Sequence, residues 1–506
     1  MSIRKLAIVC TFVLAVAALP LSAASAQVVD ATSTFTYTKN MHPLGYSPRV
    51  VPMANATPGA GVFNSDLAFW GRTAVQGTYA GFRLIDVSDP ENPSEIINWT
   101  ECASPTNTVG NQGDVIIWGD LLIRSWNSPT PAPNIPGTTT PIPVTDPARY
   151  STPGAFCGEW AMFREPAAPP LPERGQEGVH IIDISDRLNP EVIGFVDTPC
   201  GSHTETLLPD LANNRLLVYS NPSSGNVFGG DPGGPTPVSC AGMDVIEVPL
   251  DDPASASYLR FEPAGHEDDP ASEHHPCHDS AVILGDVMRL ACAGVPGAAV
   301  YSLDEADGGS FEDPMFLYNV ATGGSGIGHS VSFTWDGKYL IVGHEPGGGA
   351  GARCDAGDPP VERTFFFHNI ESNQEGPQVG RFVIPRLQTT TENCTTHNYN
   401  VVPTNKRYVM VSGNYQSGIS VVDFTNPAAA TEIAYADPAP LVNPDNPAAI
   451  ELGGDWSTYW YNGFLYESDI LRGLIIWNLS DRAVAGAKKF DHLNPQTQET
   501  SFALKR

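Results

Sequence analysis

The sequence predicts an all-β protein that folds as a seven-bladed β-propeller of four-stranded antiparallel blades. Three observations predict this fold. A short apolar phrase recurs seven times, glycine-containing turns precede several of its copies, and 48 glycines and 46 prolines in 506 residues interrupt the chain too often for a helical protein. With 16% charged residues and many Val, Ile, Tyr and Phe runs, the composition favours short strands joined by long turns.

Each copy of the phrase is a buried strand that ends in a polar side chain and, in six of seven copies, begins with glycine. The copies are Gly81 to Asp86, Gly178 to Asp183, Gly242 to Glu247, Gly297 to Ser302, Arg363 to His368, Gly418 to Asp423 and Gly473 to Asn478. Their last residues are 97, 64, 55, 66, 55 and 55 positions apart, and Pro/Gly-rich insertions such as Asn127 to Glu177 fill the longer gaps.

Hairpins before the phrase and a strand after it complete each four-stranded unit. Two-residue turns predict the hairpins: Gly119-Asp120 follows Asp114 to Trp118, Gly285-Asp286 follows Ser280 to Leu284, and Asp336-Gly337 follows Ser330 to Trp335. Segments such as Val192 to Asp197 and Glu432 to Asp437 supply the fourth strand. Seven such units without long helices are typical of a propeller.

The chain divides into four parts. Arg4 and Lys5, the apolar run Leu6 to Leu19 and the small-residue pattern Ala24-Ser25-Ala26 predict a secretory signal peptide over residues 1–26. Residues 27–60 form an N-terminal segment, residues 61–485 the propeller and residues 486–506 a C-terminal tail. Closing the ring needs a strand from the far end of the chain, and we expect Ser33 to Thr38 to supply it, with the tail from Asn494 as the competitor.

The phrase Gly178 to Pro190 resembles the LVIVD repeat of secreted and surface β-propellers. A second landmark of that repeat, a strand opening near His-Asp or His-Asn, is present at His278 and His397. The resemblance covers roughly residues 61 to 480 and is weakest in the copies ending at Ser302 and His368. It implies a propeller and export, and it implies little about activity.

Cysteine usage fits an exported protein. Without Cys10 in the leader, eight cysteines remain, and an even number in an exported chain predicts disulfides. All eight lie in or beside loops of one face, so pairing between neighbours is geometrically sensible, although 105 connectivities exist. The neighbour pairs are Cys102–Cys157, Cys200–Cys240, Cys277–Cys292 and Cys354–Cys394.

The charge limits the partners. The net charge is −29, and removing the two cations of the leader makes it about −31. Such a surface repels phosphate backbones and anionic lipids, which argues against nucleic acid and membrane partners. We expect a monomer that is secreted, periplasmic or on the cell surface, with an extracellular or periplasmic protein or a small ligand as its partner.

Four histidines suggest where the chemistry lies. His203, His278, His329 and His397 each stand at the start of the first strand of consecutive blades. Because these starts converge on the propeller axis, the imidazoles are candidate ligands for copper, zinc or iron. Some other seven-bladed propellers, including the selenium-binding or methanethiol-oxidase group, are similar in placing metal-binding histidines near the axis. The alternative is that each ring hydrogen-bonds the backbone of a neighbouring blade.

Residues near these positions in other blades are Asp66, Asp114 and Trp456, while Glu205 and Tyr399 follow a histidine by two positions on the same side of a strand. The dense run from His266 to His278 is expected to be a solvated acidic loop. His344-Glu345 ends a second strand before the glycine run Pro346 to Gly351, which lacks the context of a phosphate loop.

Three functions follow from these patterns. The first is a non-catalytic exported propeller that binds a partner or ligand on its loop-rich, histidine-bearing face. The second is a metal-dependent oxidoreductase with axial histidine ligands. The third is a hydrolase acting on an extracellular polymer, for which the sequence offers no paired carboxylates. Whether the protein is an enzyme stays open at this point.

Overall fold

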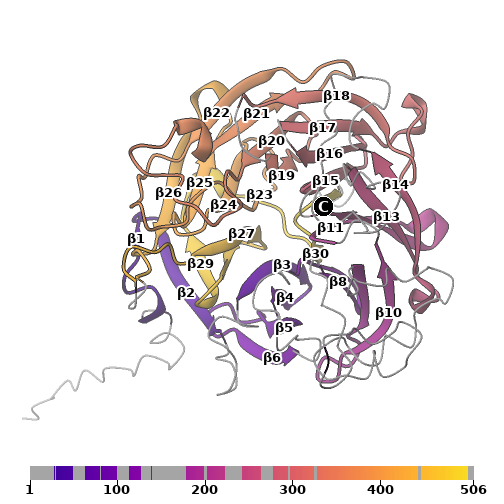
Figure 1. Ribbon diagram of the computed structural model, residues 1–506, viewed down its shortest axis with the longest axis horizontal. Coiled ribbons are helices and arrows are strands. Elements are labelled where there is room, and N and C mark those ends of the chain that lie inside the picture. Colours follow the sequence, from indigo (N-terminus) through magenta and orange to yellow (C-terminus); the bar gives the residue numbers. More distant parts are fainter. Residues whose placement is uncertain are drawn as a thin grey trace, which may run out of the picture.

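A computed structural model describes residues 28, 30–49, 63–79, 81–99, 113–126, 138, 178–198, 202–222, 242–263, 277–294, 297–323, 328–442 and 446–499. These residues form seven small sheets arranged in a ring, the predicted seven-bladed β-propeller (Figure 1). Within each blade the chain runs from an inner strand at the axis to an outer strand at the rim. Within the described ranges, no helix combines the length and the apolar character that a bilayer crossing needs.

The strands of the blades, from the inside outward, are as follows. Blade 1 contains β3 (Asn64–Trp70), β4 (Thr73–Thr78), β5 (Gly81–Asp86) and β6 (Ser94–Trp99), and blade 2 contains β7 (Val115–Trp118), β8 (Leu121–Trp126), β9 (Gly178–Asp183) and β10 (Glu191–Asp197). Blade 3 contains β11 (Thr204–Asp210), β12 (Arg215–Asn221), β13 (Gly242–Pro249) and β14 (Ser257–Pro263), and blade 4 contains β15 (Asp279–Leu284), β16 (Arg289–Gly294), β17 (Gly297–Ser302) and β18 (Met315–Ala321).

Blade 5 contains β19 (Gly328–Phe333), β20 (Tyr339–His344), β21 (Thr364–Asn369) and β22 (Gln378–Val383). Blade 6 contains β23 (Tyr399–Val401), β24 (Val409–Gly413), β25 (Ile419–Asp423) and β26 (Thr431–Asp437), and blade 7 contains β27 (Asp455–Tyr461), β28 (Phe464–Asp469) and β29 (Gly473–Leu479). The described 3-10 turns are η3 (Leu211–Asn213), η4 (Pro253–Ser255), η5 (Glu305–Asp307), η6 (Pro360–Arg363), η7 (Pro427–Ala429) and η8 (Arg482–Val484).

The recurring phrase is the third strand of each blade, and its two end residues have distinct roles. A Cβ on Gly81 or Gly297 would stand 2.0 Å from a carbonyl oxygen of the neighbouring fourth strand, so only glycine lets the two backbones pair there. At the other end, the carboxylates of Asp86, Asp183 and Asp423 accept hydrogen bonds from the backbone N–H two residues on (2.7–2.9 Å). These contacts form the turns that lead to the outer strands.

The apolar core lies between blades rather than inside any one of them. Seven clusters of buried side chains each join two neighbouring sheets, including one in which Phe69 of blade 1 packs on Tyr461 of blade 7 with ring centroids 4.6 Å apart. The strands therefore read as nearly continuous apolar runs because both faces of each sheet are covered.

The N-terminal segment closes the ring, but not with the residues that the sequence suggested. β2 (Met41–Pro48) pairs with β29 as the outer strand of blade 7. The predicted segment Ser33 to Thr38 instead contributes β1 (Thr36–Tyr37), a fifth strand on blade 6. The expectation failed because β2 contains Pro43 and Pro48, which argue against a central strand. Proline is tolerated here because β2 is an edge strand whose outer side needs no donor.

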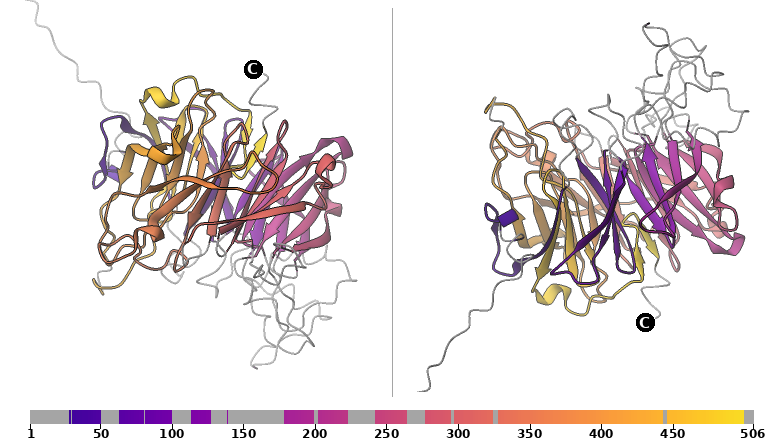
Figure 2. Two further views of the ribbon diagram at one scale, coloured as in Figure 1. Left: turned by 90° about the horizontal axis from the view of Figure 1, so that it is seen from above. Right: turned by 90° about the horizontal axis from the view of Figure 1, so that it is seen from below.

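The C-terminal tail seals one end of the axis instead of closing the ring. β30 (His492–Leu493) pairs with β3, and β31 (Thr497–Glu499) pairs with β15. The amide of Asn494 exchanges two hydrogen bonds with the backbone of Ile117 (2.8 and 3.0 Å), and Gln498 Oε1 accepts from Phe333 N (3.1 Å). Figure 2 shows this yellow segment on one face of the disc. The first strands end at the tail, so they begin at the opposite face.

Candidate metal centre

The structure brings the four predicted histidines together in one row at the start of the inner strands of blades 3 to 6. The ring centroids of neighbours are 4.8 Å apart for His203 and His278, 4.1 Å for His278 and His329, and 4.4 Å for His329 and His397. All four side chains are buried. The row is therefore a continuous line of buried imidazoles at the end of the axis opposite the C-terminal tail.

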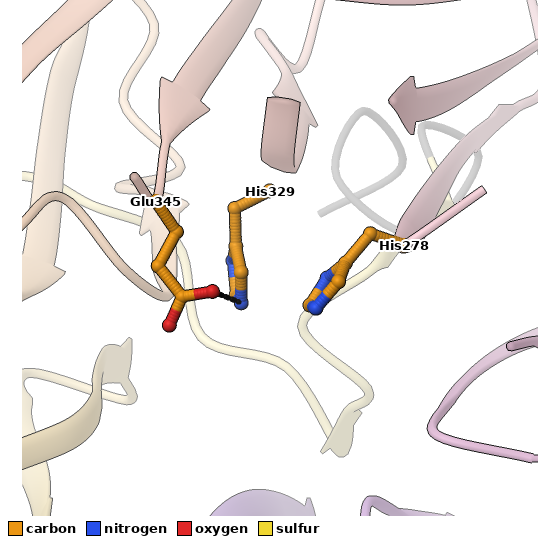
Figure 3. Close-up of side chains that lie close together, drawn as sticks. All are labelled: His278, His329 and Glu345. Atoms are coloured by element: carbon orange, nitrogen blue, oxygen red, sulfur yellow. Dashed lines mark ion pairs between the residues drawn. The ribbon is translucent and has the colours of Figure 1, made fainter. Parts of the chain in front are cut away.

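Glu345 faces this row from the loop that follows β20. Its Oε2 lies 3.5 Å from His329 Nε2, and its Oε1 lies 3.7 Å from His397 Nε2. One ligand atom from each of His278, His329 and Glu345 can be chosen so that all three lie within 4.8 Å of one another. Figure 3 shows these three side chains pointing toward a common point.

Neighbouring groups fix which ring nitrogens carry lone pairs. His397 Nδ1 donates to the carbonyl oxygen of Trp456, and the Ser330 hydroxyl, which donates to Asn398 Oδ1 (2.9 Å), accepts from His329 Nδ1. Both Nε2 atoms are then unprotonated and directed at the carboxylate. Among the residues that the structure describes, His278 Nδ1 has no hydrogen-bond partner and is buried. The Nε2 lone pairs of His329 and His397 thus converge on the carboxyl group of Glu345.

Tyr415 covers the same cluster. Its hydroxyl lies 2.5 Å from Glu345 Oε1 and 2.9 Å from His397 Nε2, so one proton serves two acceptors. The residue lies in the loop between β24 and β25 with φ of 52°, a left-handed conformation that costs free energy for a non-glycine residue. Paired backbone hydrogen bonds with Asp455 (2.9 Å each) hold it there.

Burial favours the neutral form of every titratable group in the cluster. Burial lowers the pKa of His278 to about 4 and that of His397 to about 3. Burial, reinforced by the other imidazoles, also lowers the pKa of His203 and His329 well below the ordinary value. Burial raises the pKa of Glu345 to about 8. The imidazoles are therefore unprotonated at neutral pH, the state in which histidine binds a metal.

Other residues near the axis lie elsewhere than expected. Glu205 accepts hydrogen bonds from Ser202 and Ser220, and the Tyr399 hydroxyl donates to backbone carbonyls of blade 5, so neither belongs to the cluster. Asp66 lies deeper, where it accepts hydrogen bonds from Tyr459 (2.7 Å) and from Gln496 of the tail (3.2 Å). Asp114 is likewise committed, with Oδ2 accepting from the backbone of Glu205.

A second set of converging acids belongs to blade 7. Asp455, Glu467 and Asp469 lie within 4.8 Å of one another. Asp469 pairs with Arg472 (2.7 Å), and Glu467 accepts from the indole of Trp477 (2.6 Å). Burial raises the pKa of Glu467 to about 7 and that of Asp455 well above its ordinary value, so these two acids share a proton within the protein rather than presenting free charge.

Two of the four neighbour disulfides are present, Cys277–Cys292 and Cys354–Cys394, as the neighbour pairing predicted. Cys102, Cys157, Cys200 and Cys240 lie outside the described residues, as do the signal peptide and the acidic run from His266 to His275. The two bridges indicate folding in an oxidising compartment. Cys277 directly precedes His278, and Cys394 precedes His397 by three residues.

No family model matches the chain, and no curated protein matches it in sequence. Solved structures align with most of the chain at low sequence identity. A protein from Lactobacillus plantarum has a TM-score of 0.44 at 11% identity, covering 86% of this chain and 98% of its own. The periplasmic gluconolactonase of Pseudomonas aeruginosa scores 0.41 at 10% identity, with coverages of 80% and 88%. Hydrazine synthase of Kuenenia stuttgartiensis scores 0.42 at 11% identity, with coverages of 83% and 95%. None of these likenesses bears on the activity of this chain.

Proposed function

We propose that this protein is an exported, LVIVD-repeat-like β-propeller that binds a transition-metal ion at the histidine-bearing end of its axis. His278, His329 and Glu345 are the proposed ligands, and His397 and His203 extend the site on either side. The observation that carries the proposal is the approach of two unprotonated Nε2 atoms to the two oxygens of one buried carboxylate, at 3.5 and 3.7 Å.

These separations suit a shared cation. Two ligand atoms that each lie about 2.1 Å from a tetrahedral ion stand about 3.4 Å apart. Imidazole nitrogen with one carboxylate selects zinc, copper or iron, whereas calcium and magnesium prefer all-oxygen sites. The hydrogen bonds from His397 to Trp456 and from His329 to Ser330 supply the orienting contacts that metal-binding histidines usually have.

A metal-dependent oxidoreductase is the second candidate, and Tyr415 is the observation that favours it. A phenol hydroxyl 2.9 Å from His397 Nε2 could deliver a proton to a molecule bound at the metal. If the first candidate function is correct, the protein binds the metal, or a small ligand on the metal, without catalysing a reaction. Exchange of Tyr415 for Phe also removes the hydrogen bond that orients Glu345, so the variant is compared with the wild type at saturating metal. Under that condition it should reduce turnover only in the second case.

We further propose that residues 1–26 direct export and are removed, and that the mature protein acts as a monomer outside the cytoplasm. The two disulfides support an oxidising location. The acidic surface supports a protein or small-ligand partner over nucleic acid or anionic lipid.

Metal content is the deciding measurement. The mature protein, produced without a histidine tag or chelator, is compared with a His329→Gln/Glu345→Gln variant and with His42→Ala, which removes an exposed histidine from the outer strand β2. We expect near-stoichiometric zinc, copper or iron in the wild type and in His42→Ala, and loss of it in the double variant. A metal-free wild type that also fails to bind added Zn²⁺, Cu²⁺ or Fe²⁺ would contradict the proposal.

A further inference from the structure

A second site candidate lies on the opposite face of the disc, where the inner strands end. A pocket of about 320 Å³ is formed there by turns of blades 4, 5 and 6 and by the segment leading into the C-terminal tail. Its walls include Trp335 of blade 5, the turn around Lys406 of blade 6, and Lys488 of the tail segment. The volume is within the range of small-molecule sites.

One wall of the pocket is a fixed aromatic ring. The indole N–H of Trp335 donates to the carbonyl of Val401 (2.7 Å), and its ring packs against Phe490 with centroids 4.8 Å apart. These contacts hold the partly exposed ring in one orientation. A pre-oriented apolar face lowers the entropic cost of binding a flat or ring-shaped ligand.

The pocket is also a local exception in charge. The whole chain has 27 basic and 56 acidic residues, yet three basic residues, Lys406, Arg407 and Lys488, line this pocket beside only two acids, Asp286 and Asp336. Arg407 is neutralised by Asp423 (2.6 Å). Within the described part of the chain, neither lysine forms an ion pair with a carboxylate. Two ammonium groups therefore offer charge to the anionic part of a ligand, while the two carboxylates of the same wall favour hydroxyl donors on the rest of it.

Acceptors stand beside these cations. Asp336 lines the pocket, and its carboxylate is fixed by hydrogen bonds from Thr334, Lys338 N and the Tyr408 hydroxyl (2.6–3.1 Å). A carboxylate has capacity for further donors, and the amide of Asn405 adds a donor and an acceptor. A purely aromatic acid would leave Asp336 facing an apolar surface. A ligand with hydroxyl groups as well as a negative charge can contact both the lysines and Asp336.

We propose that this pocket binds the carboxylated sugar unit of an acidic saccharide. The sugar ring lies against Trp335, its carboxylate meets Lys406 and Lys488, and its hydroxyl groups donate to Asp336. The site is independent of the histidine cluster, because the two occupy opposite ends of the inner strands. A propeller exported to the cell exterior would then hold an acidic glycan on one face while its other face stays free for the metal.

The test uses the full-length mature protein and digalacturonate as the probe, with its methyl ester as the uncharged match. Calorimetry follows binding to the wild type, to Lys406→Ala/Lys488→Ala, and to Lys39→Ala/Arg381→Ala, which removes the same charge outside the pocket. We expect the acid to bind the wild type and the control pair alike. The pocket variant and the ester should each weaken binding by roughly tenfold or more.

Four outcomes would overturn the proposal. They are no binding of the acid at millimolar concentration, equal binding of the ester, unchanged affinity in the pocket variant, or an equal loss in the control pair. Thermal unfolding of each variant without ligand confirms that any loss of affinity is not a loss of fold.

Discussion

The glycine loop beside the metal centre offers a matched pair of substitutions that tests the site geometry. Gly348 and Gly349 follow Glu345 by three and four residues, and both have left-handed φ angles, 61° and 66°. A Cβ at position 348 would meet nothing within 4 Å. A Cβ at position 349 would stand 2.3 Å from the Tyr415 hydroxyl and 2.7 Å from Glu345 Oε1. Backbone strain is thus common to both alanine variants, and only one of them disturbs the cluster.

The structure sets the expected magnitudes. Each alanine costs about 1–2 kcal/mol for the left-handed backbone. Gly349→Ala must also displace Tyr415 by about 1 Å, which breaks its hydrogen bonds to Glu345 and His397 and adds about 1–3 kcal/mol. Because Tyr415 orients a proposed ligand, we expect Gly349→Ala to weaken metal binding by about 10- to 100-fold. Gly348→Ala should bind metal as the wild type does.

Thermal unfolding of the metal-free proteins and calorimetric titration with Zn²⁺ separate the two effects. We expect both variants to unfold at lower temperature than the wild type, with Gly349→Ala the less stable of the two. We also expect only Gly349→Ala to lose affinity. Equal affinity in the two variants would show that the Tyr415–Glu345 contact does not shape the site, and the ligand assignment of Glu345 would then fall.

Three further predictions concern the fold. Gln498→Ala leaves the backbone N–H of Phe333 without its buried partner and should lower the free energy of unfolding by about 1–3 kcal/mol in a urea titration; an unchanged midpoint would mean that the tail adds nothing to the ring. Replacing Cys277 and Cys292 by serine opens a loop of 15 residues and should cost about 3 kcal/mol by the same assay, whereas a negligible cost would place the bridge's effect outside loop entropy. Burial raises the pKa of Asp437 to about 6 against the lowering effect of Arg386. Since the folded protein holds this proton more tightly than the unfolded chain, stability should fall as pH rises from about 4 through 6. Asp437→Asn should therefore be the more stable protein at pH 7.5 and not at pH 4, and a difference of the same size at both values would refute the assignment.

The fold could be predicted from the repeat because the initial glycine and the terminal polar residue of the phrase are required by local backbone geometry. Glycine at the start of the phrase is required by a carbonyl oxygen 2.0 Å from the missing Cβ, as at Gly297, and the terminal acid makes a turn that any such strand needs. The closing strand was not readable in the same way. β2 contains none of these landmarks, and its prolines are explained only by its place at the rim of blade 7.

The residues of the candidate metal centre likewise fall into those that the sequence predicted and those that it did not. The histidines were found because they occupy one register position in four successive blades, and symmetry alone brings such positions to the axis. Glu345 was noted in the sequence as the residue after His344. No sequence pattern predicted that the loop after it would turn back over the axis. Tyr415 had no signal at all, since its approach to His397 depends on a left-handed φ and on backbone pairing with Asp455.

The contribution of residues outside the repeat helps to decide whether the histidine cluster is a feature of the repeat or a metal site. If the histidines were only a feature of the repeat, each ring would bond the backbone of a neighbouring blade, as His397 does with Trp456, and nothing would require a carboxyl group from a different loop to meet two of them. Instead the Cys354–Cys394 bridge ties the loop after Glu345 to the segment that carries His397, and Gly349 permits the contact that places Tyr415 over both. Backbone strain at Tyr415, a glycine without room for a side chain and a covalent bridge all act on one buried set of neutral imidazoles and a carboxyl group. Such convergence costs stability, and a cation bound to the lone pairs of His329 and Glu345 is the simplest compensation for that cost.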